Sequence, residues 1–261
     1  MQNDEQNNVR HDRRKVLGSL GAMGLLGGSL LMGCKNNGTG GVLAGSSTDT
    51  TDSSDSTDTS SALAGSCVLI PQETEGPYPL MAVLSNSAMV RADITEGKSG
   101  VPLTVKLKIY DVNNSCAAIS GASVYIWHCD KDGVYSGYSQ PGINTVGETF
   151  CRGIQDTDAD GEVIFTTIYP GWYTGRITHI HFRVFLYGST NATATSQIAF
   201  PQAVTTEVYN SSLYVSHGQN TSVSSFASDN IFSDGTTYQM ATISGDIENG
   251  YVATLNVGIA A

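Results

Sequence analysis

The chain has 261 residues, with 13 lysines and arginines against 24 aspartates and glutamates, which gives a formal net charge of −11. This acidic balance argues against nucleic acids and anionic membrane surfaces as partners, because both would repel it. Residues 65–261 are enough for one domain with a full hydrophobic core.

The first 33 residues have the features of an export signal. Arg13 and Arg14 precede a weakly hydrophobic, glycine-rich run that ends in Leu31-Met-Gly-Cys34. A twin arginine before such a run is typical of a Tat-type bacterial signal peptide, and the last four residues resemble a lipobox. We therefore predict cleavage before Cys34, a lipid anchor on that cysteine and a location in the bacterial cell envelope. The alternative is an unmodified leader with a chance cysteine.

Residues 34–64 are rich in Ser, Thr and Asp and contain few apolar side chains. Burial of so little apolar surface cannot offset the entropy lost on ordering. We predict a disordered, flexible tether that leads into a single domain over residues 65–261.

Four cysteines remain beyond Cys34, namely Cys67, Cys116, Cys129 and Cys151. An even number in an exported protein favours two disulfides, for which three pairings exist. We favour Cys129–Cys151, which would clamp the loop around Tyr135, with Cys67–Cys116 as the second bond. Four free thiols are the alternative.

Short runs that alternate apolar and polar residues fill the domain, separated by clusters of Gly, Asn and Asp. These runs are residues 103–110, 122–127, 162–168, 179–186, 196–200 and 251–257. Strands at this spacing, without long helical periods, predict an all-β fold: an antiparallel β-sandwich core with long loops. We expect only a short helical turn near residues 226–232, and we see no chemistry in residues 222–249.

The run Asp156-Thr-Asp-Ala-Asp-Gly161 begins like an EF-hand calcium loop. The glutamate required at the twelfth position would be residue 167, which is Thr167. Strand-like runs rather than helices flank the segment, so we interpret it as a β-turn.

His179 and His181 lie two residues apart in an alternating run, so both imidazoles share one face of a strand. Imidazole is the commonest metal ligand among side chains, and two on one face can bind one ion. Otherwise they are two polar residues on a solvated face. Tyr173 and Arg176 lie just upstream.

Four ordered motifs carry a resemblance to a known family. They are Trp127-His-Cys-Asp-Lys-Asp-Gly-Val-Tyr135, Arg152-Gly-Ile-Gln-Asp-Thr-Asp158, Tyr169-Pro-Gly-Trp-Tyr173 and Gly175-Arg-Ile-Thr-His-Ile-His-Phe182. Together they resemble the intradiol ring-cleavage dioxygenases, which include the catechol and protocatechuate dioxygenases. The resemblance runs from about residue 74 to about residue 200, with a looser tail.

The resemblance implies one mononuclear, non-haem Fe(III) ion. Its ligands would be Tyr135, Tyr173, His179 and His181. The substrates would be a small aromatic diol and O2, with cleavage between the two hydroxylated carbons to a muconate-type diacid. Tyr173 would leave the metal on substrate binding and accept a proton, with Tyr169 as the substitute ligand if Tyr173 is not one.

Two further catalytic residues follow from the same resemblance. Arg176 matches the family's active-site arginine and would stabilise negative charge on the substrate. Gln197 matches a glutamine of the family pocket. Tyr173 and His179 are separated by a shorter loop than is usual in the family, and the helical dimerisation segment of the catechol enzymes has no counterpart. The particular diol and the oligomeric state therefore stay open.

Three other aromatic side chains lie near these motifs. Tyr78 either lines the pocket mouth or packs under a loop, His128 is expected to pack or hydrogen-bond beside Tyr135, and His217 is expected to be solvated.

Two other classes of function remain. A zinc hydrolase would use His179 and His181 with a third His, Asp or Glu ligand. An envelope-anchored β-sandwich could instead bind a ligand without turnover.

Overall fold

The computed structural model describes residues 67–261. The predicted signal peptide, Cys34 and the predicted tether lie outside the described residues. Within residues 67–261 no helix has the length and apolar character needed to cross a membrane.

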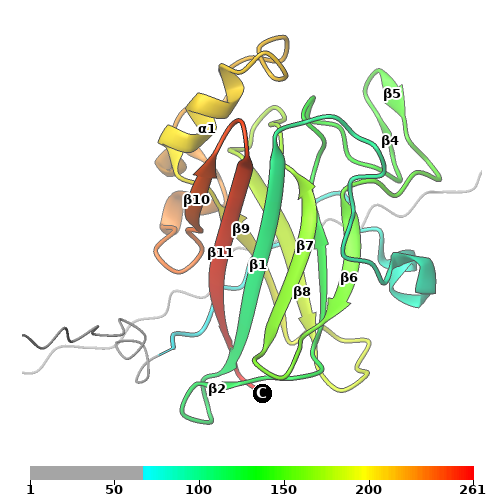
Figure 1. Ribbon diagram of the computed structural model, residues 1–261, viewed down its shortest axis with the longest axis vertical. Coiled ribbons are helices and arrows are strands. Elements are labelled where there is room, and N and C mark those ends of the chain that lie inside the picture. Colours follow the sequence, from blue (N-terminus) through cyan, green and yellow to red (C-terminus); the bar gives the residue numbers. More distant parts are fainter. Residues whose placement is uncertain (1–66) are drawn as a thin grey trace, which may run out of the picture. The chain divides into compact units, whose positions relative to one another are not determined.

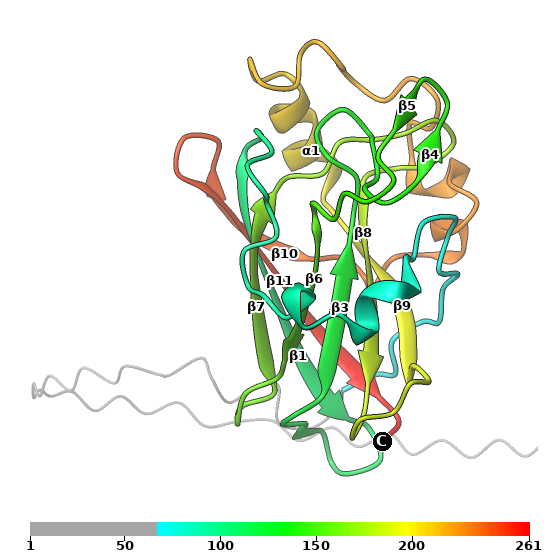
Figure 2. The same cartoon turned by 90° about the vertical axis from the view of Figure 1, so that its right-hand side faces the viewer.

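Two sheets form the body of the fold (Figures 1 and 2). The first contains β10 (Thr242–Asp246), β11 (Gly250–Ile259), β1 (Pro102–Asp111), β7 (Glu162–Ile168) and β2 (Ala117–Ala118). The second has the order β6 (Arg152–Asp156), β3 (Ser123–Trp127), β8 (His179–Phe185) and β9 (Ala194–Ala199). A separate hairpin joins β4 (Ser139–Gln140) to β5 (Ile143–Asn144). The all-β prediction is confirmed.

The sheets pack through the alternating residues that the sequence indicates. On β1, Leu103, Val105, Leu107 and Ile109 are each at most 1% exposed. They share one core cluster with buried residues of the second sheet, including Val124 on β3 and Phe182 on β8. Alternate residues of a strand point to opposite faces, so one face of each strand is buried in the core.

One pair of strands departs from the predicted antiparallel arrangement. β1 pairs with β11 in parallel, with Leu103 opposite Tyr251 and Ile109 opposite Val257. The other sheet pairs are antiparallel. Strand direction depends on how distant segments meet, and alternation within one strand carries no information about it.

Helical structure is short. The helix α1 (Gln202–Tyr209), which buries Val208 and Tyr209, was not predicted from the sequence. Short 3-10 helices are η2 (Met81–Ser85), η3 (Ser87–Met89), η4 (Phe226–Ser228) and η5 (Phe232–Asp234). The last two confirm the expected helical turn near residues 226–232.

The segment that begins like an EF-hand is the turn between β6 and β7. The Asp158 carboxylate accepts hydrogen bonds from the backbone N–H groups of Asp160 and Glu162, at 2.9 and 2.8 Å. The β-turn prediction is confirmed.

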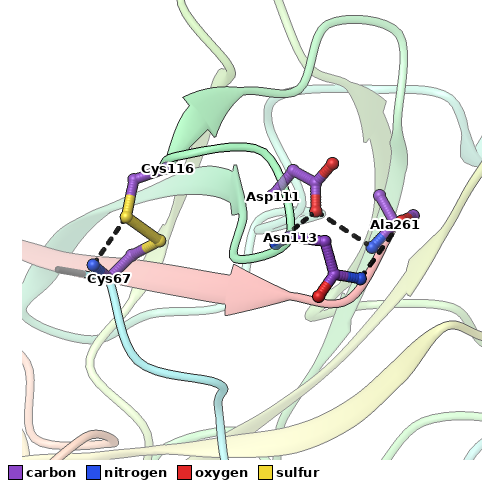
Figure 3. Close-up of a disulfide and its surroundings, with 5 residues drawn as sticks. All are labelled: Cys67, Asp111, Asn113, Cys116 and Ala261. Carbon is purple, nitrogen blue, oxygen red and sulfur yellow. Dashed lines mark hydrogen bonds between the residues drawn. A yellow bond between two sulfur atoms is a disulfide. The ribbon is translucent and has the colours of Figure 1, made fainter.

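One of the two expected disulfides is present. Cys67 and Cys116 are bonded, with a Cα–Cα distance of 5.6 Å, so the start of the described chain is attached beyond the end of β1 (Figure 3). In the same turn, the Asp111 carboxylate accepts a hydrogen bond from the backbone N–H of Ala261 at 3.3 Å. Both ends of the described chain are therefore fastened at the β1–β2 turn.

The other expected disulfide, Cys129–Cys151, is absent, and both thiols are free and buried. Trp127 lies opposite Arg152, and the His128 N–H donates to the Cys151 carbonyl at 3.1 Å. Cys151 is therefore opposite His128, and the register places it one residue away from the position opposite Cys129. Since neighbouring residues of a strand point to opposite faces, the two thiols pack in different apolar clusters.

Candidate metal centre

The candidate site lies at one end of the second sheet, where β3 ends and β8 begins, on the side of β4 and β5 in Figure 2. The strand β8 starts at His179, so His179 and His181 share one face, as the sequence predicts. Tyr135 comes from the loop after β3, and Tyr173 from the loop before β8. In the sheet, His181 lies between Trp127 of β3 and Gln197 of β9.

Four donor atoms meet at this end of the sheet. The His179 Nε2 atom lies 3.1 Å from His181 Nε2, 3.4 Å from the Tyr135 hydroxyl and 3.5 Å from the Tyr173 hydroxyl. Tyr135, His179 and His181 are at most 3% exposed, whereas Tyr173 is half-buried. All four residues proposed as ligands are thus brought together.

The hydrogen bonding of His179 directs a lone pair into this cluster. Its Nδ1 atom lies 2.6 Å from the Ile177 carbonyl oxygen. A carbonyl oxygen only accepts, so Nδ1 carries the hydrogen and Nε2 is the free acceptor. Burial, reinforced by the nearby Arg176, lowers the pKa of His179 to about 3. The ring is therefore neutral at pH 7, the form that binds metals.

Burial shifts the pKa values of the two tyrosines in the opposite direction to that of His179. Burial raises the pKa of Tyr173 to about 12, and it also raises the pKa of Tyr135 well above its ordinary value. Even beside the Arg176 guanidinium, burial keeps both phenols protonated at neutral pH when no metal ion is bound. A highly charged ion between them would reverse this, because it stabilises the phenolate form.

The residues present fit a single metal ion. Nitrogen or oxygen ligands about 2.1 Å from one ion lie roughly 3.0–3.4 Å from each other, which is close to the separations observed here. The buried His181 Nδ1 has no hydrogen-bond partner among residues 67–261. Those residues contain no group of three His, Cys, Asp or Glu side chains placed to hold a metal. The oxygen atoms beside the imidazoles come from tyrosines.

Arg176 and Gln197 also belong to the site. Arg176 is 8% exposed; its Nη1 atom lies 3.5 Å from His179 Nε2, and its Nη2 group donates to Gln197 Oε1 at 2.6 Å. The guanidinium therefore lies directly beside the four donor atoms.

Asp229, which no sequence motif indicated, holds Arg176 in place. The Arg176 Nε–H donates to Asp229 Oδ2 at 2.9 Å, and the backbone N–H groups of Ile177 and Ile231 donate to the same carboxylate at 2.8 Å. Asp229 is fully buried. It lies in residues 222–249, where no chemistry was expected, and no motif or spacing near Arg176 points to it.

Arg152 holds the loop that carries Tyr135. Its guanidinium donates to the hydroxyl and the carbonyl of Ser136, at 2.8 and 2.7 Å, and to the Tyr78 carbonyl at 2.7 Å. Arg152 is fully buried. Arg152 is the first residue of the second sequence motif, which could have indicated its importance, but the resemblance implied no role for it.

Two glycines let the tyrosine loops cross. At Gly133, which has φ +81°, a Cβ would lie 2.2 Å from the Trp172 carbonyl oxygen. At Gly171 a Cβ would lie 2.4 Å from the Lys131 carbonyl oxygen. Any side chain at these points would push the two loops apart, so glycine in both motifs has a steric cause.

A pocket of about 410 Å³ adjoins the site. Its lining residues are Tyr78, Asp132, Gly133, Val134, Gln140, Pro141, Ile143, Trp172, Tyr173, Thr174 and His217. A larger cavity of about 680 Å³ lies beside the disulfide and contains none of the proposed site residues. The smaller pocket is the relevant one because Tyr173 belongs to both it and the donor cluster.

The structure also shows the surroundings of Tyr78, His217 and Tyr169. Tyr78 lines the pocket and packs on Tyr135, with ring centroids 4.8 Å apart. The expectation that His217 is solvated is wrong: its Nε2 lies 2.8 Å from the Trp172 carbonyl, and the rings pack at 4.6 Å. The Tyr169 hydroxyl does not hydrogen-bond to the donor cluster. It pairs with the Thr205 hydroxyl at 2.8 Å in the core.

His128 behaves as expected from the sequence. It is fully buried, and its ring nitrogens lie 2.8 Å from the Thr167 hydroxyl and 2.8 Å from the Cys129 carbonyl. Both polar atoms have partners, so its role is hydrogen bonding within the fold.

Comparison with known proteins gives matches among solved structures. An intradiol ring-cleavage dioxygenase from Tetranychus urticae is 29% identical, with a TM-score of 0.63, over 74% of this chain and 95% of its own. A second dioxygenase is 29% identical over the same shares, with a TM-score of 0.64. A third match, which supports the fold, is the dioxygenase domain of a dioxygenase carbohydrate-binding fusion protein from Streptomyces sp. SirexAA-E. It is 23% identical, with a TM-score of 0.51, over 74% of this chain and 98% of its own. No family model and no curated protein matches the sequence.

The fold and these matches define the class of protein, a β-sandwich of the ring-cleaving dioxygenase type. Within that class, the chain is similar to the intradiol ring-cleavage dioxygenase from Tetranychus urticae.

Proposed function

We propose that the protein is a mononuclear, non-haem Fe(III) dioxygenase. It would cleave a catechol-type ring between the two hydroxylated carbons and incorporate both atoms of O2 to give a muconate-type diacid. One observation carries this proposal. The second imidazole nitrogen, from His181, and the two phenol oxygens, from Tyr135 and Tyr173, all lie within 3.5 Å of His179 Nε2.

The donor chemistry supports Fe(III) as the ion. Tyr135, Tyr173, His179 and His181 would hold it. Phenolate is a hard, strongly donating oxygen ligand, and burial disfavours it here unless a high positive charge is present. When bound, the ion would stabilise the deprotonated oxygens of the diol and so prepare the ring for reaction with O2.

The two tyrosines are suited to different roles. Tyr135 is enclosed, with its loop fixed by Arg152, whereas Tyr173 is half-buried and lines the pocket. Tyr173 is therefore the phenol with room to move away, and as a base it would take a proton from the arriving diol.

Arg176 is suited to stabilise negative charge that develops on the substrate. It is a fixed, buried cation, oriented by Asp229 and Gln197. The aromatic walls formed by Tyr78 and Trp172 would orient the ring in the pocket.

The experiment is to load the purified protein with iron and measure O2 uptake, visible absorption and product mass with labelled O2. We expect a tyrosinate-to-iron absorption band and a diacid containing both labelled oxygens. Tyr135→Phe should lose most of the band, while Tyr110→Phe on β1 serves as a control. A colourless zinc-dependent hydrolase, or a coloured protein that binds diols without consuming O2, would contradict the proposal.

We also propose that the protein is exported and held at the bacterial envelope by lipid on Cys34. The support is Arg13-Arg14 with Leu31-Met-Gly-Cys34, together with the Cys67–Cys116 disulfide, since such bonds persist in oxidising compartments. Replacing Cys34 with Ser should move the protein from the membrane fraction to the soluble fraction. Unchanged fractionation would contradict the anchor.

A further inference from the structure

The pocket next to the donor cluster is larger than one aromatic ring requires. Its volume is about 410 Å³, whereas a cavity of roughly 150 Å³ is enough to hold benzene. Tyr173 connects it to the donor cluster, because its hydroxyl lies 3.5 Å from His179 Nε2. A diol bound at the cluster would therefore leave room for a substituent that extends toward the β4–β5 hairpin, where Gln140, Pro141 and Ile143 line the pocket.

The pocket walls are mostly uncharged. Tyr78, Pro141, Ile143 and Trp172 supply apolar surface. None of the lining residues is Lys or Arg, and the single carboxylate among them is Asp132. The walls therefore suit a neutral group and offer an anionic one no lysine or arginine to pair with.

Two cations that contact pocket-lining residues are already bound to other groups. Lys131, which does not line the pocket, donates to the Asp132 carboxylate at 2.7 Å. Arg152 donates to Ser136 and to the Tyr78 carbonyl. A carboxylate on the substrate would thus enter the pocket beside Asp132 without a free cation to pair with it.

Arg176 does not fill this gap. It lies beside His179 and is bound by Asp229 and Gln197, and it is not among the residues that line the outer pocket. An anion that enters the pocket loses part of its hydration, and no ion pair compensates for that loss.

We propose that the substrate is a catechol with an uncharged substituent that occupies this pocket, and that the pocket selects against carboxylated catechols. This inference rests on the proposed function. The ring with its two hydroxyl groups would lie at the donor cluster, and the substituent would lie between Trp172 and the β4–β5 hairpin.

The test uses a matched pair, 3,4-dihydroxybenzoate and its methyl ester, which differ mainly in charge. Binding is measured first, by anaerobic titration of the iron-loaded protein, and kcat/KM for ring cleavage second. We expect the ester to bind about tenfold or more tightly than the acid and to be cleaved with a similarly higher kcat/KM. A preference for the acid in either measurement would overturn the inference.

A variant with an added cation makes the test sharper. Ile143 is an exposed residue of β5 that lines the pocket, so Ile143→Arg should be tolerated and should shift the ester-to-acid ratio about tenfold toward the acid. Val146→Arg, at a position that is 67% exposed and outside the pocket lining, is the matched control and should leave the ratio unchanged. Equal ratios in wild type and Ile143→Arg would overturn the inference.

Failure of the proposed function would look different. If the iron-loaded protein cleaves neither compound nor unsubstituted catechol, the proposed function falls, and this inference falls with it. If rings are cleaved but the acid is preferred, the dioxygenase proposal stands and only the pocket inference is overturned.

Discussion

At the scale of single residues, the site depends on side chains that hold the proposed ligands as much as on the ligands themselves. Asp229 binds Arg176, Arg152 binds the loop of Tyr135, and the Ile177 carbonyl fixes the tautomer of His179. Such supporting contacts commonly change activity by 10-fold to 100-fold when removed. Two substitutions separate holding a metal from using it.

Tyr173→Phe removes one phenol oxygen and keeps the ring. Since Tyr135, His179 and His181 would remain, we expect the variant to retain iron, with a weaker and shifted absorption band. Turnover should fall by at least about 100-fold, because the base that accepts the diol proton is lost. Iron analysis, the visible spectrum and kcat are the measurements. A spectrum identical to wild type would mean that Tyr173 is not a ligand.

Asp229→Asn should leave iron content and the absorption band unchanged, because Asp229 contacts Arg176 and not the donor atoms. The carboxylate accepts from Arg176 and from the backbone of Ile177, and an amide cannot accept all of these bonds. We expect kcat to fall about 10-fold to 100-fold with little change in KM. Asp246→Asn, which affects only an exposed turn, is the control. Full kcat in Asp229→Asn would contradict a positioning role.

At the scale of elements, the fold attaches both ends of the described chain to the turn between β1 and β2. The Cys67–Cys116 disulfide connects positions 49 residues apart, and the Asp111 carboxylate binds the backbone of Ala261. The parallel β1–β11 pair runs into the same turn, so the disulfide closes the chain over the edge of the first sheet.

Replacing Cys116 with Ser should lower the free energy of unfolding. Closing a loop of this length restricts the unfolded chain, which the chain-entropy model values at about 4 kcal/mol, with about 2–4 kcal/mol typically measured. Thermal unfolding of wild type and variant, each with and without a reducing agent, measures it. The reducing agent should lower the Tm of wild type and leave that of the variant unchanged; equal effects on both would contradict the assignment.

At the scale of the whole molecule, the sandwich buries histidines in their neutral form. Burial lowers the pKa of His128 to about 4, and His179 and His181 are shifted in the same direction. A depressed histidine pKa means that the unfolded chain takes up protons first as the pH falls. The free energy of unfolding therefore decreases from about pH 6.5 downward and levels off below the folded-state pKa.

His128→Gln should remove one part of this pH dependence. With a pKa of about 4 when folded and 6.5 when unfolded, His128 makes the wild type lose about 2 kcal/mol more than the variant between pH 7 and pH 5. Urea unfolding of the iron-free proteins at the two pH values gives the difference, and the contributions of His179 and His181 cancel in the comparison. An identical pH dependence in the two proteins would contradict burial of a neutral His128.

The sequence by itself predicted those features that depend on short-range geometry. Alternation in residues 103–110 and 179–186 predicted buried strands because successive side chains of a strand must point to opposite faces. The same rule put His179 and His181 on one face. The family resemblance added Tyr135, Tyr173, Arg176 and Gln197, which the fold brings together.

Only the tertiary structure decided the features that depend on distant segments meeting. The parallel direction of β11 against β1, the free thiols of Cys129 and Cys151, and the contact of Asp229 with Arg176 all fall in this group. The helix α1 was missed because its eight residues are too few for a periodic apolar pattern to stand out. Local patterns record which face of a strand is buried, but strand direction, cysteine pairing and contacts between residues 53 positions apart arise only when the chain is packed.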